Sequence, residues 1–208
     1  MKLHFKLLLF FLVLSNLSLG FYIINENAFF DKKNQHSLNQ ISNLKEQSKA
    51  IAKEMAQAIY FAGTAKLSPQ VKLVDIDNTS RNLSDILGVK KILFYRFTET
   101  NCDACVEAEM IYLKELAKKI GIERIVLLVS YGNLNELKAI RNTYQIQFAI
   151  YNTPYSDLLN NGIEKLNVPY AFLADKLNGI NMVFIPDKSY PIISDEYHKT
   201  VLNILLNK

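Results

Sequence analysis

The feature that most constrains this chain is a pair of cysteines, Cys102-Asp-Ala-Cys105, between a predicted strand and a predicted helix. Residues 91–97 are apolar and rich in β-forming residues, and the helical periodicity of residues 105–120 ends at a glycine. Cys102 therefore falls at the N-terminus of a helix, where unpaired N–H groups and the helix dipole stabilise a thiolate. Cys105 follows one helical turn later, within reach of a disulfide formed at Cys102. We predict that Cys102 is the nucleophile of a redox pair and Cys105 the resolving thiol.

Three other roles for the two cysteines compete with this one. They are the only cysteines in the chain, which excludes a framework of several structural disulfides. A structural disulfide across so short a loop would add little stability by the entropic account. A zinc site needs four ligands, and the remaining histidines are His4, His36 and His198, so we predict no metal. Burial as inert core cysteines is disfavoured by the polar loop around Asp103.

A second feature is Val168-Pro169, which stands immediately before the apolar stretch 170–174. A proline at the start of a strand is ordinary, because it lacks the N–H that a ladder requires. Combined with the cysteine motif, however, it favours a cis peptide bond that exposes strand-edge backbone to a substrate. We therefore expect Val168 and Pro169 to bind substrate next to the cysteines.

The rest of the second half of the chain alternates between strand and helix patterns. This alternation predicts a mixed central sheet covered by helices on both faces, ending in an antiparallel pair. The predicted strands are 71–76, 91–97, 124–130, 148–151, 170–174 and 181–185, and the predicted helices are 82–88, 105–120, 134–144, 156–166 and 195–206.

Residues 1–24 read as an export segment. Lys2 and Lys6 precede the apolar run 7–14, which is the pattern of a signal sequence whose positive end stays in the cytoplasm. Small residues before Phe21 suit a cleavage site, whereas the apolar character that resumes at Phe21 favours an uncleaved membrane anchor. We expect a membrane anchor, with a cleaved signal peptide as the alternative and a buried soluble helix as the remaining one.

Residues 25–66 connect this segment to a domain spanning 67–208. The polar stretch 25–40 predicts an irregular linker, and apolar residues at helical spacing over 41–62 predict an amphipathic stalk helix. A dimerising coiled coil remains an alternative for the stalk. The formal net charge of +4 is spread along the chain without a dense basic block, so nucleic-acid binding is not expected.

From about Pro69 onward the chain resembles the membrane-tethered, TlpA-like thioredoxins, which are related to the redoxin (AhpC/TSA) group. The resemblance rests on residues 71–88, 92–97, 102–105, 167–175 and 178–179. It implies a thioredoxin-like fold with an extra strand–helix insertion at 148–166 and a thiol–disulfide oxidoreductase activity without a cofactor. It also implies a protein disulfide as substrate and a thiol protein as donor, on the periplasm-facing side of a bacterial cytoplasmic membrane. Secretion, or release into the periplasm after cleavage, is the alternative location.

The chain departs from that family around the cysteines. Asn101 replaces the usual aromatic residue before the first cysteine, and Ala104 replaces the usual proline before the second. The acidic residue usually found three positions after the second cysteine is absent, although Glu107 and Glu109 flank that position.

Acidic residues crowd the expected thiolate. Glu99 and Asp103, together with Glu107 and Glu109, oppose the helix dipole and should leave the pKa of Cys102 less depressed than in a strong oxidant. A less stabilised thiolate lowers the reduction potential, so we hypothesise a reducing pair.

Three alternative functions remain. Redoxin peroxidases share the scaffold, but Glu99 and Tyr95 stand where that group usually carries a Thr or Ser and a proline. Copper could bind both thiolates together with His198. A scaffold or adhesion role that merely keeps the fold is the last alternative.

Overall fold

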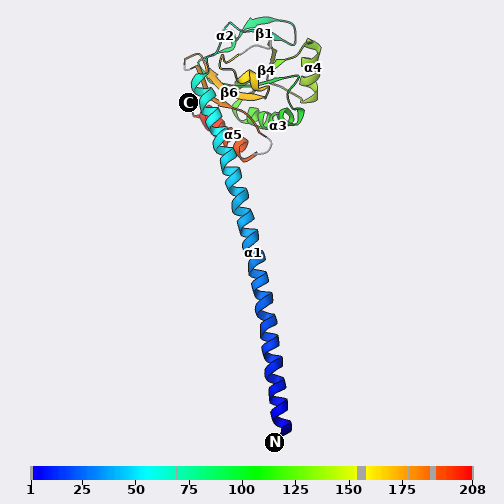
Figure 1. The fold of residues 1–208 in the computed structure, drawn as a ribbon. Helices are drawn as coiled ribbons and strands as arrows, with labels where there is room; N and C mark the ends of the chain where they lie inside the picture. Colours follow the sequence, from blue (N-terminus) through cyan, green and yellow to red (C-terminus); the bar gives the residue numbers. More distant parts are fainter. Residues whose placement is uncertain (1, 69, 154–157, 178, 188–190, 208) are drawn as a thin grey trace. The chain divides into compact units, whose positions relative to one another are not determined.

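The computed structural model describes residues 2–68, 70–153, 158–177, 179–187 and 191–207. The chain divides into two units, one ending at Ala50 and the other beginning at Ile51. Helix α1 (Lys2–Thr64) contributes to both units (Figure 1). The irregular linker expected at 25–40 is wrong, because these residues are helical. Residues 21–62 contain neither glycine nor proline, so nothing in the polar stretch interrupts the helix.

The first unit is the helical part of α1 up to Ala50, and its described side chains are almost all exposed. Within the described part of the chain, no helix has an apolar stretch long enough to cross a membrane.

The second unit is built on a seven-stranded sheet with the order β2-β1-β5-β4-β3-β6-β7. The central strands β3, β4 and β5 run parallel, whereas the other neighbours pair antiparallel. The mixed sheet and the final antiparallel pair are therefore as predicted, and β2 was not foreseen. The strands are β1 (Lys72–Asp75), β2 (Ser80–Asn82), β3 (Ile92–Thr98), β4 (Ile125–Ser130), β5 (Ala149–Asn152), β6 (Tyr170–Asp175) and β7 (Gly179–Phe184).

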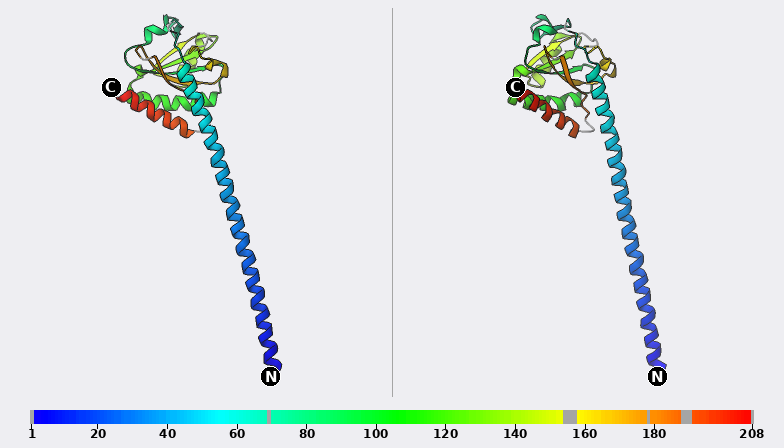
Figure 2. Two further views of the ribbon diagram at one scale, coloured as in Figure 1. Left: turned by 60° about the vertical axis from the view of Figure 1, so that its left-hand side comes forward. Right: turned by 90° about the vertical axis from the view of Figure 1, so that its left-hand side faces the viewer.

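Most of the predicted helices are present, and α3 and α5 lie side by side in the views of Figure 2. Helix α3 ends at Gly121, whose φ of +94° favours glycine, and a Cβ there would meet the Glu123 carboxylate at 2.5 Å. The helices are α2 (Leu83–Ile86), α3 (Asp103–Ile120), α4 (Leu134–Thr143) and α5 (Pro191–Leu206), with 3₁₀ turns η1 (Ile122–Arg124) and η2 (Ile163–Leu166).

The helix predicted over 156–166 is wrong where the structure describes it, because residues 158–162 form turns before η2. Residues 154–157, which include its predicted start, lie outside the described residues. Asn160 and Gly162 adopt positive φ values of 48° and 78°, and the Asn161 side chain accepts from the backbone N–H of Ile163. Local side-chain bonding and left-handed residues thus compete successfully with the helix.

The two sheet faces carry separate apolar clusters, because side chains alternate along each strand. One face packs against α3, α4 and α5 and includes Leu93, Tyr95 and Phe97 of β3. The opposite face includes Ile92 and Phe94 of the same strand. This second cluster also receives the buried side chains of the turns that follow β5.

The last turn of α1 belongs to the second cluster. Phe61 is buried, and its carbonyl oxygen accepts from the side chain of Asn161 at 3.0 Å. The Lys66 backbone N–H donates to the Leu159 carbonyl at 2.8 Å. The end of the predicted stalk is therefore part of the domain's own core.

Candidate functional site

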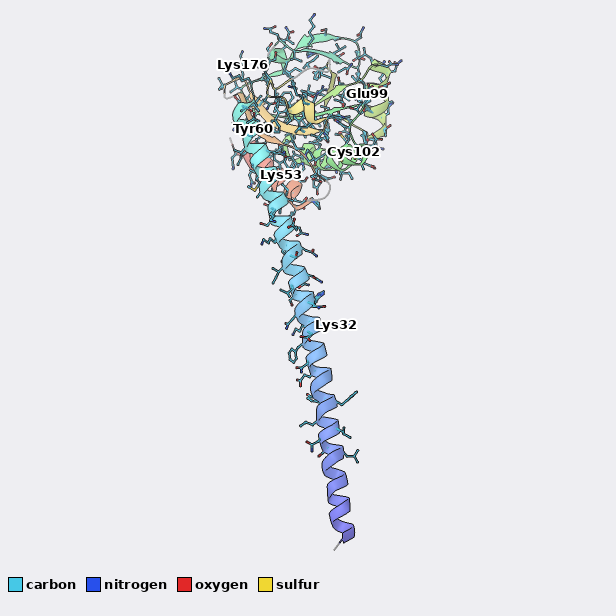
Figure 3. All side chains as sticks on the ribbon, viewed as in Figure 1. Lys32, Lys53, Tyr60, Glu99, Cys102 and Lys176 are labelled. Atoms are coloured by element: carbon cyan, nitrogen blue, oxygen red, sulfur yellow. The ribbon has the colours of Figure 1, made fainter. Side chains whose placement is uncertain are left out.

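The two cysteines occupy the positions that the motif predicts. Cys102 is the N-cap of α3, with extended backbone angles, and its side chain is exposed. Cys105 is half-buried one turn later, and its backbone N–H donates to the Cys102 carbonyl at 3.0 Å. The outer thiol therefore lies at the N-terminus of α3, where the helix dipole favours its thiolate. Figure 3 labels Cys102 and Glu99, both on the segment that joins β3 to α3.

The residue before the motif, Asn101, is buried and ties two loops together. Its side-chain oxygen accepts from the Thr98 backbone N–H at 2.8 Å, and its amide donates to the Asn167 carbonyl at 3.0 Å. Thr100 adds a 2.7 Å hydrogen bond from its hydroxyl to the side-chain oxygen of Asn167. The family that the sequence resembles usually has an aromatic residue at this position. Here Asn101 instead joins the two loops through hydrogen bonds. The partner residue Asn167 could not be predicted from the sequence, because it lies 66 residues away.

Val168 and Pro169 line the same cavity as the two cysteines, but the cis bond expected between Val168 and Pro169 is wrong. Every peptide bond among the described residues is trans. Asn167, which follows η2, has a φ of 50°, and asparagine tolerates this left-handed conformation. Pro169 is buried and Val168 is half-buried.

These residues share one apolar groove of about 720 Å³. Its walls come from the end of α1, the segment before β6, strand β7 and helix α5. A bulge in β7 places Met182 at the wall with a φ of 55°. The lining is Ile51, Met55, Gln57, Ala58, Cys102, Cys105, Asn167, Val168, Pro169, Met182, Val183, Phe184, Ile185, Pro186, Asp187, Ile192, Ile193, Glu196, Tyr197 and Thr200. The thiols therefore open onto a largely hydrophobic surface.

Glu99 and Asp103 stand within three residues of Cys102 in the chain. Both side chains are exposed, and Asp103 is the first residue of α3. Both carboxylates affect Tyr131. Burial is the largest cause that raises the pKa of Tyr131 to about 12, and the negative charges of Asp103 and Glu99 contribute among other groups. Glu99 also lines a second, polar cavity of about 550 Å³ at the ends of the parallel strands.

A buried polar pair lies below the thiols. Glu109, on α3 one turn after Cys105, is 2% exposed, and its Oε2 lies 3.0 Å from Nε2 of His198 on α5. Burial, then Glu109 and Cys105, raise the pKa of Tyr95 on β3 well above its usual range. The closeness of Glu109 to the motif is evident from the sequence. Neither the burial of Glu109 nor its contact with His198 on α5 could be predicted.

The site offers little for a metal. His198 is buried and bonded to Glu109. No group of three His, Cys, Asp or Glu side chains suited to a metal ion occurs among the residues the structure describes.

Comparison with known proteins shows the fold. No protein-family model matches the chain, and no curated protein matches it in sequence. A candidate protein disulfide isomerase from Bacteroides thetaiotaomicron matches in structure with a TM-score of 0.52 at 12% identity, covering 69% of this chain and 90% of that one. A candidate thiol:disulfide interchange protein DsbE from Chlorobium tepidum matches with a TM-score of 0.51 at 12% identity, covering 68% and 97%. The domain therefore has a thioredoxin-like α/β fold, with a mixed sheet and flanking helices.

Proposed function

We propose that this protein is a thiol–disulfide oxidoreductase that uses Cys102 and Cys105. The observation that carries the proposal is the placement of both thiols, the outer at the N-cap of α3 and the inner one turn later, on one groove with Val168 and Pro169. The interchange activity named for the structural neighbour from Chlorobium tepidum agrees with this chemistry.

The exchange takes place in two steps. The Cys102 thiolate attacks one sulfur of a partner disulfide, and the other partner sulfur leaves as a thiolate. Cys105 then loses its proton and attacks Sγ of Cys102, which forms the intramolecular disulfide and releases the second partner sulfur. The partner gains two electrons, and the Cys102–Cys105 pair is oxidised.

The groove suits a protein disulfide flanked by apolar residues. Its lining is mostly apolar, and Val168 and Pro169, which precede β6, line the same groove as the two thiols. We further propose that the pair works as a reductase, because Glu99 and Asp103 destabilise the outer thiolate. A separate thiol protein would restore the dithiol.

We also propose that the domain works on the exported side of a bacterial membrane, tethered by residues 1–24. The support is the positive charge of Lys2 and Lys6 before the apolar run 7–14. A membrane-impermeant maleimide added to intact spheroplasts tests this location, because the chain has only two cysteines to label. Labelling only after lysis would contradict it.

The test of the activity is a redox titration of the full-length chain in mild detergent. We expect one reversible two-electron transition across glutathione or dithiothreitol buffers, with thiols counted by a mass-shifting reagent. Cys102→Ser should abolish it, and Cys105→Ser should accumulate a mixed disulfide with a peptide substrate. Thiols that stay reduced, or stay bonded, across all buffers would reject the proposal and leave a structural role.

A further inference from the structure

The polar cavity at the ends of the parallel strands has no part in the chemistry described so far. It measures about 550 Å³ and is lined by the last residues of β3, β4 and β5 and by residues that follow them. The carboxyl ends of parallel strands are the usual place for a ligand in an open α/β sheet. The lining combines Ser, Thr and Tyr hydroxyls with the side-chain amides of Asn152 and Asn167 and the carboxylate of Glu99.

We propose that this polar cavity binds the cationic side chain of an arginine or lysine that lies close to the disulfide of the partner protein. The inference rests on the proposed exchange activity and names a substrate class for it. Two placements connect the polar cavity to the thiols. Asn167 lines both the polar cavity and the apolar groove that Cys102 and Cys105 line. Glu99 stands three residues before Cys102, so a chain whose disulfide lies at Cys102 can place a neighbouring side chain in the polar cavity.

The hydroxyl protons of three lining residues are used inside the protein. The Thr100 hydroxyl donates to the side-chain oxygen of Asn167 at 2.7 Å, so in its 3.0 Å bond with Thr98 it is Thr98 that donates. The Ser130 hydroxyl donates to the Thr153 carbonyl oxygen at 2.9 Å. Each of the three hydroxyl oxygens keeps a lone pair. These groups therefore offer a ligand acceptors rather than donors.

Two further side chains of the lining have acceptor capacity to spare. The Glu99 carboxylate accepts from the Gly132 backbone N–H at 3.5 Å, a long bond that leaves most of its lone pairs for a ligand. Thr153 is 2% exposed, and its hydroxyl has no hydrogen-bond partner among the described residues. A buried polar group without a partner is costly, and a ligand that bonds it removes this cost.

The charge around the polar cavity is negative. Burial first, and then neighbouring groups that include Asp103 and Glu99, raise the pKa of Tyr131, which lines the cavity. Among the described residues of the lining, none is a lysine or an arginine. Ammonium and guanidinium groups carry donors only, together with a positive charge, so they match this surface in both respects. An anionic group would meet negative charge and few donors there.

The experiment compares peptide disulfides that differ by a single charge. Each has a fluorophore on one half and a quencher on the other, with an apolar residue on one side of the cysteine and arginine or citrulline on the other. Citrulline has nearly the shape of arginine without its charge. The arginine is placed in turn at each of the three nearest positions, and cleavage by the full-length protein is followed at neutral pH. The ratio of the two kcat/KM values cancels the intrinsic reactivity of Cys102.

We expect wild type to prefer arginine to citrulline, at one position at least, by about three- to tenfold, as for one charge-assisted contact at an accessible site. Glu99→Gln should bring this ratio below about twofold. Glu99→Lys should invert it and favour a glutamate peptide over its glutamine counterpart. Glu107→Gln, which removes an exposed carboxylate on α3 that lines neither the groove nor the polar cavity, is the matched control and should keep the wild-type ratio.

Equal rates for arginine and citrulline at every position in wild type would overturn the inference. A preference that persists in Glu99→Gln would also overturn it, because the attraction would then come from charges outside the polar cavity. Circular dichroism establishes that the variants fold, and if Glu99→Lys does not, Glu99→Gln carries the test. A wild-type protein that cleaves none of the peptides would instead reject the proposed function itself.

Discussion

Asn101 donates its side-chain N–H to the backbone carbonyl of Asn167 at 3.0 Å. This bond joins the loop that carries Cys102 to the loop that carries Pro169, so it holds the nucleophile in place relative to the start of β6. A buried amide that bonds on both sides is expensive to remove, because its partners lose their bonds inside the protein.

Replacing Asn101 by alanine should therefore affect both stability and exchange. We expect the free energy of unfolding to fall by about 1–3 kcal/mol, the cost of unmade buried hydrogen bonds, and the peptide exchange rate to fall with it. Urea denaturation and the peptide disulfide assay measure the two effects. Asn133→Ala is the control, since it removes the N-cap bond of α4 (2.9 Å to the Asn135 N–H) at a cost of about 1 kcal/mol. Equal exchange rates in the two variants would contradict the role of Asn101.

The apolar groove predicts a selective effect at Met55. This side chain is 56% exposed on α1 and lines the groove, whereas Ile59 is 70% exposed on the same helix and does not. Met55→Glu should lower kcat/KM for an apolar peptide disulfide about tenfold. This is the change expected when the binding free energy of roughly one buried apolar contact is lost. Exchange with dithiothreitol should not change, because that reagent needs no groove. Ile59→Glu should leave both rates unchanged, and a loss in both variants would argue against the groove.

Neutralising either of the two acidic residues near Cys102, Glu99 or Asp103, should change the reduction potential of the cysteine pair by a small amount. Glu99→Gln and Asp103→Asn should lower the pKa of Cys102 and raise the midpoint potential, because the thiolate is then better stabilised. Both carboxylates are exposed. Each should therefore move the midpoint by no more than about 20 mV, given the weakness of surface charge interactions. Redox titration at low and high salt measures the shift, which salt should reduce. A shift to lower potential would contradict the sign of the argument.

Local signals in the sequence were sufficient to predict the unit that β3, the cysteine motif and α3 form. The apolar run before Cys102 and the helix stop at Gly121 are decided by nearby residues, and both are where they were predicted. The left-handed conformation of Asn167 was not predicted, because the hydrogen bonds of Asn167 with Thr100 and Asn101 join residues that are distant in the sequence. Partners distant in sequence were also missed. Nothing near Glu109 reveals His198, and nothing in the apolar strand β3 reveals what Arg96 would bond.

Arg96 is 1% exposed in the middle of the sheet, and its Nε donates to Oε1 of Glu164 at 3.2 Å. Glu164→Leu would leave that charge buried without its counter-ion, which typically costs 3–5 kcal/mol of unfolding free energy, or about half of a small domain's stability. The double variant Arg96→Met, Glu164→Leu should be more stable than Glu164→Leu alone, because no charge then remains to be compensated. Urea denaturation compares them.

The more accessible pair of Arg81 and Asp75, at 3.6 Å, provides the control for this buried pair. Arg81→Ala should change the free energy of unfolding by less than about 1 kcal/mol. If the double variant were less stable than Glu164→Leu, the cost would come from packing rather than from the uncompensated charge.

Stability should also fall at alkaline pH because of tyrosines near the site. Burial, then Asp103 and other neighbouring groups, raise the pKa of Tyr131 from its usual 10.0 to about 12 in the folded protein. Between these values the unfolded chain has lost the phenolic proton and the folded chain keeps it, so the unfolded state binds fewer protons. The free energy of unfolding therefore decreases as the pH rises from about 10 to 12. Tyr131→Phe should weaken this decrease, measured as the urea midpoint at pH 9, 10 and 11.

The same group gives an optical test of the charge at Asp103. Absorbance at 295 nm follows tyrosine ionisation, and Asp103→Asn should bring the pKa of Tyr131 down toward 10, because a neighbouring negative charge opposes formation of a phenolate. Asp77→Asn removes an exposed carboxylate in the turn between β1 and β2, and should leave the Tyr131 titration unchanged. An identical titration curve in Asp103→Asn would mean that burial alone raises the Tyr131 pKa. In that case Asp103 would be too well screened to act on Cys102 either, and the reducing character proposed for the pair would need another cause.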